Sequence, residues 1–262
     1  MTPYLAMFSA RFRALLQYRT AALAGLCTQV FWGLIRMMVM TAFYENAVAT
    51  PPMSLAQVCS YIWLGQAFFA LIPLRVDEDL AGMIRSGDVA YELLRPVDLF
   101  SLWYSRAIAS RIVPAMMRCL PILALAGLAG WLPWPGWPAA LAGTACLLAA
   151  ALLSAAVATL MTITVFWTLS GQGISQIISM ITYLLSGMVI PLPLFPDWAQ
   201  RGLSWLPFGG LCDLPYRVLV GHIPAAAAGV VLFRQLAWLV LLLALGRWLV
   251  ARAMKRVVLQ GG

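Results

Sequence analysis

Six apolar stretches, each near or above the length of a membrane-spanning helix, divide this chain. A helix needs about 20 mainly apolar residues to cross the hydrocarbon core of a bilayer. The stretches cover residues 20–44, 56–74, 108–132, 137–168, 172–194 and 229–251. Hydrophobic residues make up 63% of the chain and charged residues only 10%, so a water-soluble protein of this size would lack the polar residues to cover its surface. The pattern therefore predicts an all-α polytopic membrane protein, a single domain over residues 1–262 with six transmembrane helices.

The residues before the first stretch follow a different pattern. At helical spacing, one stripe holds Tyr4, Leu5, Phe8, Phe12, Leu15 and Leu16. Arg13 faces away from that stripe, which makes the segment amphipathic. Such a pattern predicts a helix over residues 1–19 that lies in the membrane interface. The alternative is that these residues only begin a long first span, which the arginines at 11, 13 and 19 disfavour.

The basic residues predict the orientation of the bundle. With six spans, one side receives the N-terminal segment, the connection between spans two and three, and the end of the chain, and these segments hold most of the arginines. The opposite side receives Arg201 and Arg217, with Arg234 near its boundary. Because cytoplasmic segments carry an excess of Lys and Arg, both termini are predicted to be cytoplasmic. The excess of basic residues, a net charge of +8, is explained by their role in orienting the helices in the membrane. No nucleic-acid partner is therefore predicted.

The connection between spans two and three, residues 75–100, holds six of the nine acidic residues of the chain. The acids at 77–79 suit the start of a helix and Gly87 suits its end. A short helix is therefore predicted near 77–86, followed by a turn and a second helical piece that ends at Pro96.

Apolar residues are interleaved with the charges of this connection, among them Met83 and Ile84. A mixture of apolar anchors and oriented charges is typical of a docking surface. The charged residues that would fix the register of the contact are Asp77, Asp79, Arg85 and Asp88. The alternative interpretation is an ordinary solvated loop, which is what a run of charges usually forms.

A second informative connection, residues 191–224, lies on the opposite side. Prolines and aromatic residues alternate through it, so it is too interrupted to span the bilayer and too apolar to extend freely into water. Two short re-entrant helices with their Trp and Tyr residues at headgroup level fit this pattern. A loop folded over the bundle is the alternative.

Several polar residues fall inside the predicted spans. Arg36 and Gln29 lie seven residues apart on one face of the first span. Arg36 requires an internal partner, a subunit interface or a wet path, unless its side chain reaches the outer headgroups. A polar face in the fifth span includes Gln172, Gln176 and Ser179. Interhelical packing explains Ser and Thr well, and the two glutamines favour a dimer seam or a substrate pathway.

The residues that are missing exclude much chemistry. The single Lys, Lys255, is followed by Arg256 and Val257, so no GxxxxGK[ST] phosphate-binding loop exists. The single His and five dispersed Cys offer no zinc motif. We expect no catalytic residues, no metal and no ATP site in this chain. A disulfide between Cys59 and Cys212 is left open.

The chain resembles the permease subunits of ABC-2 type exporters. The resemblance rests on SGDVAYELLRPVD at 86–98, on SGMVIPLPLFPDW at 186–198 and on LPF at 206–208, and it covers essentially the whole chain. It implies an interfacial N-terminal helix, six spans, a cytoplasmic coupling helix in residues 75–100 and re-entrant helices in residues 191–224. The implied location is the bacterial cytoplasmic (inner) membrane.

The resemblance also implies the partners. A second permease copy or a related permease completes the pathway, and two cytoplasmic ABC ATPase subunits hold the ATP and Mg. Residues 77–98 would transmit the closure of the ATPases, with Arg11 and Arg13 beside the same ATPase. The implied coupling residues are Asp77, Glu78, Asp79, Met83, Ile84, Arg85, Asp88, Glu92, Arg95, Arg11 and Arg13.

Two other classes of protein compete with this interpretation. A membrane-embedded lipid-modifying enzyme would need convergent acids, a metal or a nucleophile–base pair at one membrane face, whereas most acids here lie in one arginine-interleaved segment. A non-transporting assembly factor would move no substrate when reconstituted with its ATPase. The substrate, the direction of transport and the choice between homodimer and heterodimer stay open at this point.

Overall fold

The computed structural model describes residues 3–17, 19–47, 50–94, 96–168 and 172–255. In these residues all regular structure is helical, which confirms the predicted class. The α-helices are α1 (Pro3–Leu16), α2 (Arg19–Glu45), α3 (Leu55–Ala67), α4 (Glu78–Ser86), α5 (Val89–Leu93), α6 (Leu99–Leu128), α7 (Trp137–Ile163), α8 (Val165–Thr168), α9 (Gln172–Leu185), α10 (Asp197–Ser204), α11 (Asp213–Leu219) and α12 (Ala228–Met254). Short 3₁₀ helices are η1 (Phe69–Leu71), η2 (Leu192–Leu194), η3 (Phe208–Gly210) and η4 (Ala225–Ala227).

Within the described residues, four helices are long and apolar enough to cross a membrane. They are Leu23–Glu45, Leu99–Leu128, Trp137–Thr168 and Ala225–Met254. The predicted second and fifth spans are shorter, because α3 has 13 residues and α9 has 14. At 1.5 Å per residue these helices rise about 20 Å, less than the hydrocarbon core of about 30 Å. The six-span count therefore stays a prediction, supported at four of its six positions.

Helix α7 forms the centre of the bundle. In its apolar window 83% of the residues are buried, against 11–22% in the other three long helices. Its alanine-rich sequence permits this position because small side chains let neighbouring helices approach closely. Helices α6, α11 and α12 pack against it. A second close approach occurs at Gly246 of α12, where a Cβ atom would lie 2.3 Å from the ring of Phe100 in α6.

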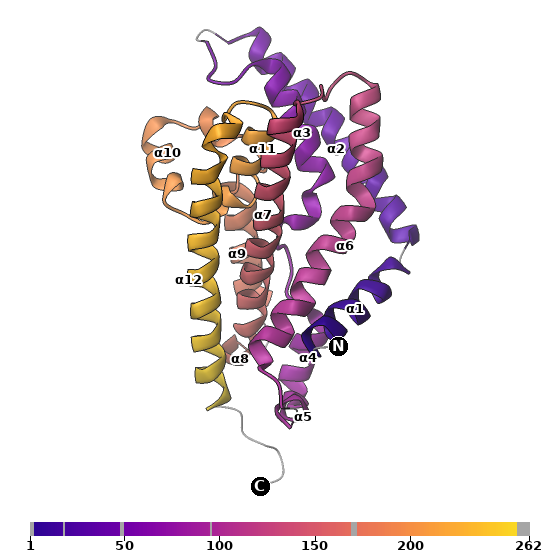
Figure 1. Ribbon diagram of the computed structural model, residues 1–262, viewed down its shortest axis with the longest axis vertical. Helices are drawn as coiled ribbons and strands as arrows, with labels where there is room; N and C mark the ends of the chain where they lie inside the picture. The colour runs from indigo at the N-terminus through magenta and orange to yellow at the C-terminus, as the bar shows by residue number, and fades with distance from the viewer. Residues whose placement is uncertain (1–2, 18, 48–49, 95, 169–171, 256–262) are drawn as a thin grey trace.

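The two ends of the bundle differ in character (Figure 1). Helices α4, α5 and α8 lie at one end, together with the C-terminal end of α12 and the start of α1, and α10 and α11 lie at the opposite end. Helix α1 packs against α6 and is separate from α2. The structure therefore confirms a distinct N-terminal helix, while its position in the membrane interface stays a prediction.

The connection at 191–224 folds into two short helices, as one of the two sequence interpretations predicted. Helix α11 is inserted against α7, and its Tyr216 is fully buried. Helix α10 is peripheral, and Trp198 and Trp205 beside it are exposed. Whether these helices enter the outer leaflet stays a prediction. Cys59 and Cys212 are both free.

Candidate functional site

Helix α4 begins and ends where the sequence predicts. Asp77 is its N-cap: the carboxylate accepts hydrogen bonds from the backbone N–H groups of Asp79 and Leu80, at 3.2 and 3.3 Å. These contacts satisfy two of the unpaired donors that every helix leaves at its start. Gly87 ends the helix in the left-handed conformation, with φ at 82°, which costs glycine little because it has no Cβ.

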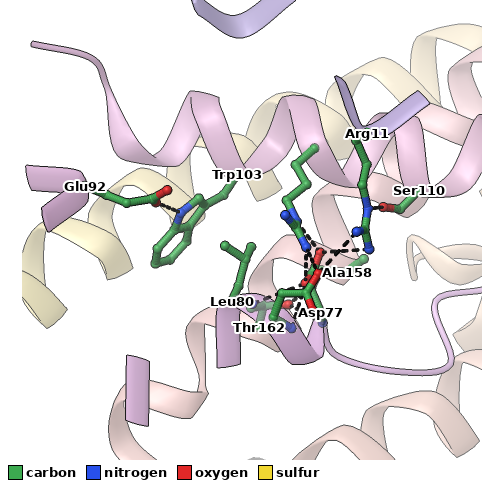
Figure 2. Close-up of polar contacts among 10 residues, drawn as sticks. Arg11, Asp77, Leu80, Glu92, Trp103, Ser110, Ala158 and Thr162 are labelled. Carbon is green, nitrogen blue, oxygen red and sulfur yellow. Dashed lines mark hydrogen bonds and ion pairs between the residues drawn. The ribbon is translucent and has the colours of Figure 1, made fainter. Parts of the chain in front are cut away.

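The Asp77 carboxylate also forms the centre of an ion-pair cluster, which we define as Arg11, Asp77, Asp79 and Arg106; Figure 2 labels Arg11 and Asp77. Arg106 of α6 contacts both oxygens of Asp77, with Nε–Oδ2 at 2.6 Å and Nη2–Oδ1 at 2.9 Å. It also donates to the carboxylate of Asp79. A planar guanidinium paired with both oxygens of a carboxylate fixes orientation as well as distance.

Arg11 brings the N-terminal helix into the same cluster. Its Nη1 lies 3.2 Å from Asp79 Oδ2, and its Nε donates to Ser110 Oγ at 3.4 Å. The backbone N–H of Asp77 donates to Thr162 Oγ1 of α7 at 3.2 Å. The start of α4 is therefore bonded to α1, α6 and α7 within one small volume, and it cannot shift without affecting all three helices.

The electrostatics of the cluster keep Asp77 ionised. Burial alone would raise the pKa of its carboxyl, but the hydrogen bonds and charge of Arg106, with the backbone N–H of Leu80 and the charge of Arg11, together outweigh burial and hold the pKa below its ordinary value of 3.8. The side chains of Asp77 and Arg106 are 16% and 14% exposed, whereas Asp79 is 65% exposed. Asp77 with Arg106 is thus the enclosed part of the cluster, and Asp79 is its edge toward solvent.

The other predicted coupling residues surround this cluster without joining it. Glu78 and Arg85 form an ion pair at 3.6 Å on the surface of α4. Asp88 accepts a hydrogen bond from Ser86 Oγ at 2.6 Å. Arg13 is exposed and donates to Ser9 Oγ of its own helix at 3.0 Å. Arg95 lies outside the described residues.

Glu92 links α5 to α6. The indole Nε1 of Trp103 donates to Glu92 Oε2 at 2.8 Å, as Figure 2 shows. Trp103 is almost fully buried, so this bond satisfies the polar atom of a core side chain. The sequence did not indicate this contact.

Met83 and Ile84, the predicted anchors, are half-buried against the protein itself. Both pack on the apolar cluster that includes Leu80 and Val89. The large apolar side chains that are exposed beside them are Tyr91 at 71% and Leu94 at 81%. Among the described side chains of α4, α5 and Leu94, Tyr91 and Leu94 are therefore the most accessible apolar groups for a docking partner.

Sequence reasoning also missed the role of Arg106, which it counted only as part of the charge asymmetry. A usable signal exists: a charge inside a long apolar helix requires a partner. Arg106 lies eight residues after Asp98, the N-cap of that helix, whose carboxylate accepts from Ser101 N at 2.9 Å. The identity of the partner depends on how α4 packs against α6, which spacing along the chain does not reveal.

Arg36, which is half-buried, and Gln29 both lie beside Gln66, away from the ion-pair cluster. Arg36 donates to the carbonyl oxygens of Met188 and Val189, the latter at 2.6 Å. Gln29 is buried. The Gln66 amide adjoins both residues, and in the orientation that satisfies both ends its oxygen accepts from Arg36 Nη1 at 3.3 Å. Arg36 thus has the internal partners that its position requires.

The polar face of α9 divides into two parts. The hydroxyl residues Ser175, Ser179, Thr182 and Ser186 are buried. Ser179 Oγ donates to the carbonyl oxygen of Leu74 at 2.7 Å, so packing within the chain accounts for it. Gln176 is exposed, and the side chain of Gln172 lies outside the described part of the chain. A role in a dimer seam or pathway therefore stays a proposal, now centred on Gln176.

We predict that Arg36→Leu will lower the free energy of unfolding by about 2 kcal/mol, because two partly buried carbonyl oxygens, those of Met188 and Val189, lose a charged donor. Arg36→Lys should cost less, since it keeps one donor. Thermal unfolding in detergent micelles measures both, with Met38→Leu on the exposed face of the same helix as the control. An unchanged unfolding temperature in Arg36→Leu would mean that the contacts with Met188 and Val189 contribute nothing.

The fold and these contacts define an integral membrane protein of several apolar helices, with charged contacts concentrated at one end. The chain belongs to the ABC-2 family of transporter proteins, whose family model matches residues 30–261. Proteins of this family are membrane components of transporters and have no ATP-binding domain of their own. No curated protein and no solved structure matches the chain.

Proposed function

We propose that this chain is the permease subunit of an ABC exporter, forming the substrate pathway as a dimer and driven by separate cytoplasmic ATPase subunits. Family membership supports the permease role. The observation that carries the finer proposal is the ion-pair cluster, because it connects the start of α4, at one end of the bundle, to α6, α1 and α7. ATP and Mg would be held by the partner ATPases.

The proposed topology has six spans, with α3 followed by η1 as the second and α9 as the fifth. Both are short, so each would need its flanking segments to complete the crossing. Arg11 and Arg106 contact Asp79 of α4, and Arg252 lies in the last turn of α12, which ends at the α4–α5 end of the bundle. The positive-inside rule makes this end cytoplasmic. Both termini would then be cytoplasmic in the bacterial inner membrane.

Coupling in this proposal is mechanical. A force on α4 and α5 reaches α6 through Asp77 and Arg106, because a carboxylate held at both oxygens resists rotation as well as separation. The same force reaches α1 through Arg11. A cluster that bonds several rigid helices can move them together, which a flexible loop cannot do.

The proposed path for the substrate, or the seam between two permeases, involves Gln29, Arg36, Gln172, Gln176 and Ser179. Polar side chains in a span avoid lipid, which supports a protein or water neighbour for the exposed Gln176. Gln29, Arg36 and Ser179 already have polar partners within the chain, which meet part of their need for a neighbour other than lipid.

The orientation is tested by cysteine labelling, because an ATPase can reach α4 and α5 only from the cytoplasm. In a variant without native cysteines, Ser86→Cys should resist an impermeant thiol reagent in intact cells and react after lysis. Ser204→Cys, at the end of α10, should react in intact cells. Both serines are exposed, so access to the reagent depends on the side of the membrane. Labelling at position 86 from outside would refute the proposal.

A further inference from the structure

A large cleft lies between α6 and α7, well away from the ion-pair cluster. Its volume is about 1020 Å³. Helix α3 contributes to its wall, and the connection between α6 and α7 borders it at the end where α10 and α11 lie. In Figure 1 the two long helices diverge toward that end. Characteristic lining residues are Leu64, Leu123, Gly127, Thr144, Leu147 and Val220.

The wall of the cleft is almost entirely apolar. In the part of the chain that the structure describes, no lining residue carries a charge. Two of its polar residues are already engaged: Gln57 Nε2 donates to the carbonyl of Val220 at 3.5 Å and its Oε1 accepts from Ser54 N at 3.0 Å. Ser60 Oγ donates to the carbonyl oxygen of Ala56 at 2.9 Å. The cleft therefore suits a neutral hydrocarbon group and offers no counter-ion for a charged one.

The surroundings of the cleft indicate where such a group would come from. Leu120 on its rim is 73% exposed on α6, a helix long and apolar enough to span the membrane. Trp134, in the connection between α6 and α7 that borders the cleft, is 67% exposed. It packs edge-to-face against Trp137, with ring centroids 5.3 Å apart. Exposed tryptophans of this kind mark the level of lipid headgroups. The opening thus runs from headgroup level into the apolar depth of the bundle.

An empty cleft of this size would be unfavourable. The side chains that line it would lose van der Waals contacts on their open side, and transfer of apolar surface from water to hydrocarbon is favourable. Inside a bilayer, the hydrocarbon available at this depth is the acyl chain of a lipid. Pockets that hold small ligands measure about 300–1,000 Å³, so the volume is sufficient.

We propose that this cleft is a lipid-binding site that takes the acyl chain of a membrane lipid from the leaflet at the α10–α11 end, with the headgroup beside Trp134. The site is separate from the proposed substrate path, because none of Gln29, Arg36, Gln176 or Ser179 lines it. The proposal does not depend on the ATPase partnership.

Gly127 provides a way to fill the cleft. It lies in α6 and lines the cleft, and a Cβ atom built there meets nothing within 4 Å. A larger side chain at this helical position should therefore occupy the lipid site without a clash, and it should favour the helix. Gly229 of α12 is the matched control, because it is also helical with open space at its Cβ but lies outside the cleft.

The test uses the full chain in nanodiscs of phosphatidylglycerol and phosphatidylethanolamine that contain a phospholipid with a diazirine in its acyl chain. After illumination, labelled peptides are mapped. We expect peptides containing Leu123 and Leu147 to be labelled more strongly than the exposed face of α12 around Leu241. Gly127→Phe should reduce their labelling to the α12 level, Gly127→Leu should reduce it partly, and Gly229→Phe should leave it unchanged.

Two results would overturn the assignment. Equal labelling of the cleft and α12 in the native chain would mean annular lipid only. Cleft labelling that survives Gly127→Phe would place the lipid elsewhere. Thermal unfolding of each variant shows whether a loss of labelling comes from a folding defect or from a filled site. If Gly127→Phe unfolds, the labelling of the cleft peptides in Gly127→Ala and Gly127→Leu is compared, and labelling that does not decrease with side-chain size would overturn the assignment.

Discussion

Replacing Arg106 by leucine should lower the free energy of unfolding by about 3 kcal/mol, because it leaves Asp77 enclosed without a cationic partner on α6. The value lies at the low end for a broken buried pair, since 16% of the Asp77 side chain remains in contact with solvent. The free energy of unfolding of Arg106→Lys should fall between those of the native chain and Arg106→Leu, because an ammonium group keeps the charge and loses the two-point contact. Thermal and denaturant unfolding in micelles measure the differences.

The same variant should change the response to acid. The pKa of Asp77 is held below 3.8, so its contribution to stability is fully present above that value and is lost as the pH falls through the lowered folded pKa. Arg106→Leu should weaken this acid-dependent loss, because it removes the group that contributes most to lowering the pKa of Asp77 and leaves the backbone N–H of Leu80 and the charge of Arg11. Arg201→Leu, an exposed arginine at the opposite end, is the control. If the stability of Arg106→Leu and its dependence on pH equal those of the native chain, the ion-pair cluster does not hold α4 in place.

Association with the ATPase should depend on the exposed apolar groups of the α4–α5 end. Truncating a buried hot-spot side chain costs about 2 kcal/mol or more, roughly a thirtyfold loss of affinity. Tyr91→Ala combined with Leu94→Ala should therefore release most of the ATPase during purification. These side chains are 71% and 81% exposed, so the permease itself should stay folded.

The pair Met83→Ala and Ile84→Ala gives a contrasting result. Both side chains pack on the core beside Leu80, so this double variant should lose intrinsic stability as well as ATPase binding. Trp198→Ala with Trp205→Ala, exposed at the opposite end, should affect neither property. If both α4–α5 double variants keep full ATPase association, residues 77–98 are only a solvated connection.

Local chemistry made α4 predictable before its structure was known. Asp77 can cap a helix, and Gly87 can end one, so both boundaries follow from neighbouring residues alone. The separate helix α1 followed similarly from its periodic apolar stripe. Such features need no information about distant parts of the chain.

The remaining parts depend on tertiary packing. The contact of Arg106 with Asp77 joins residues 29 positions apart, and the contact of Arg36 with Val189 joins residues 153 apart. Apolar content suggested spans at 56–74 and 172–194, but composition alone does not show that α3 gives way to η1 or that α9 stops before Gly187, where φ is 81°. The exposure of Tyr91 and Leu94, likewise, is set by which face of the segment packs on α6.

Dependence on a separate ATPase is tested by measuring ATP hydrolysis by the chain alone and by the complex obtained on co-expression with its ABC ATPase. We expect no hydrolysis by the purified 28.6 kDa chain, which lacks a phosphate-binding loop. We also expect stable co-purification of the ATPase and hydrolysis by the complex. Hydrolysis that follows the pure chain through chromatography, or an ATPase that never co-purifies, would contradict the assignment of this protein as a permease driven by a separate ATPase.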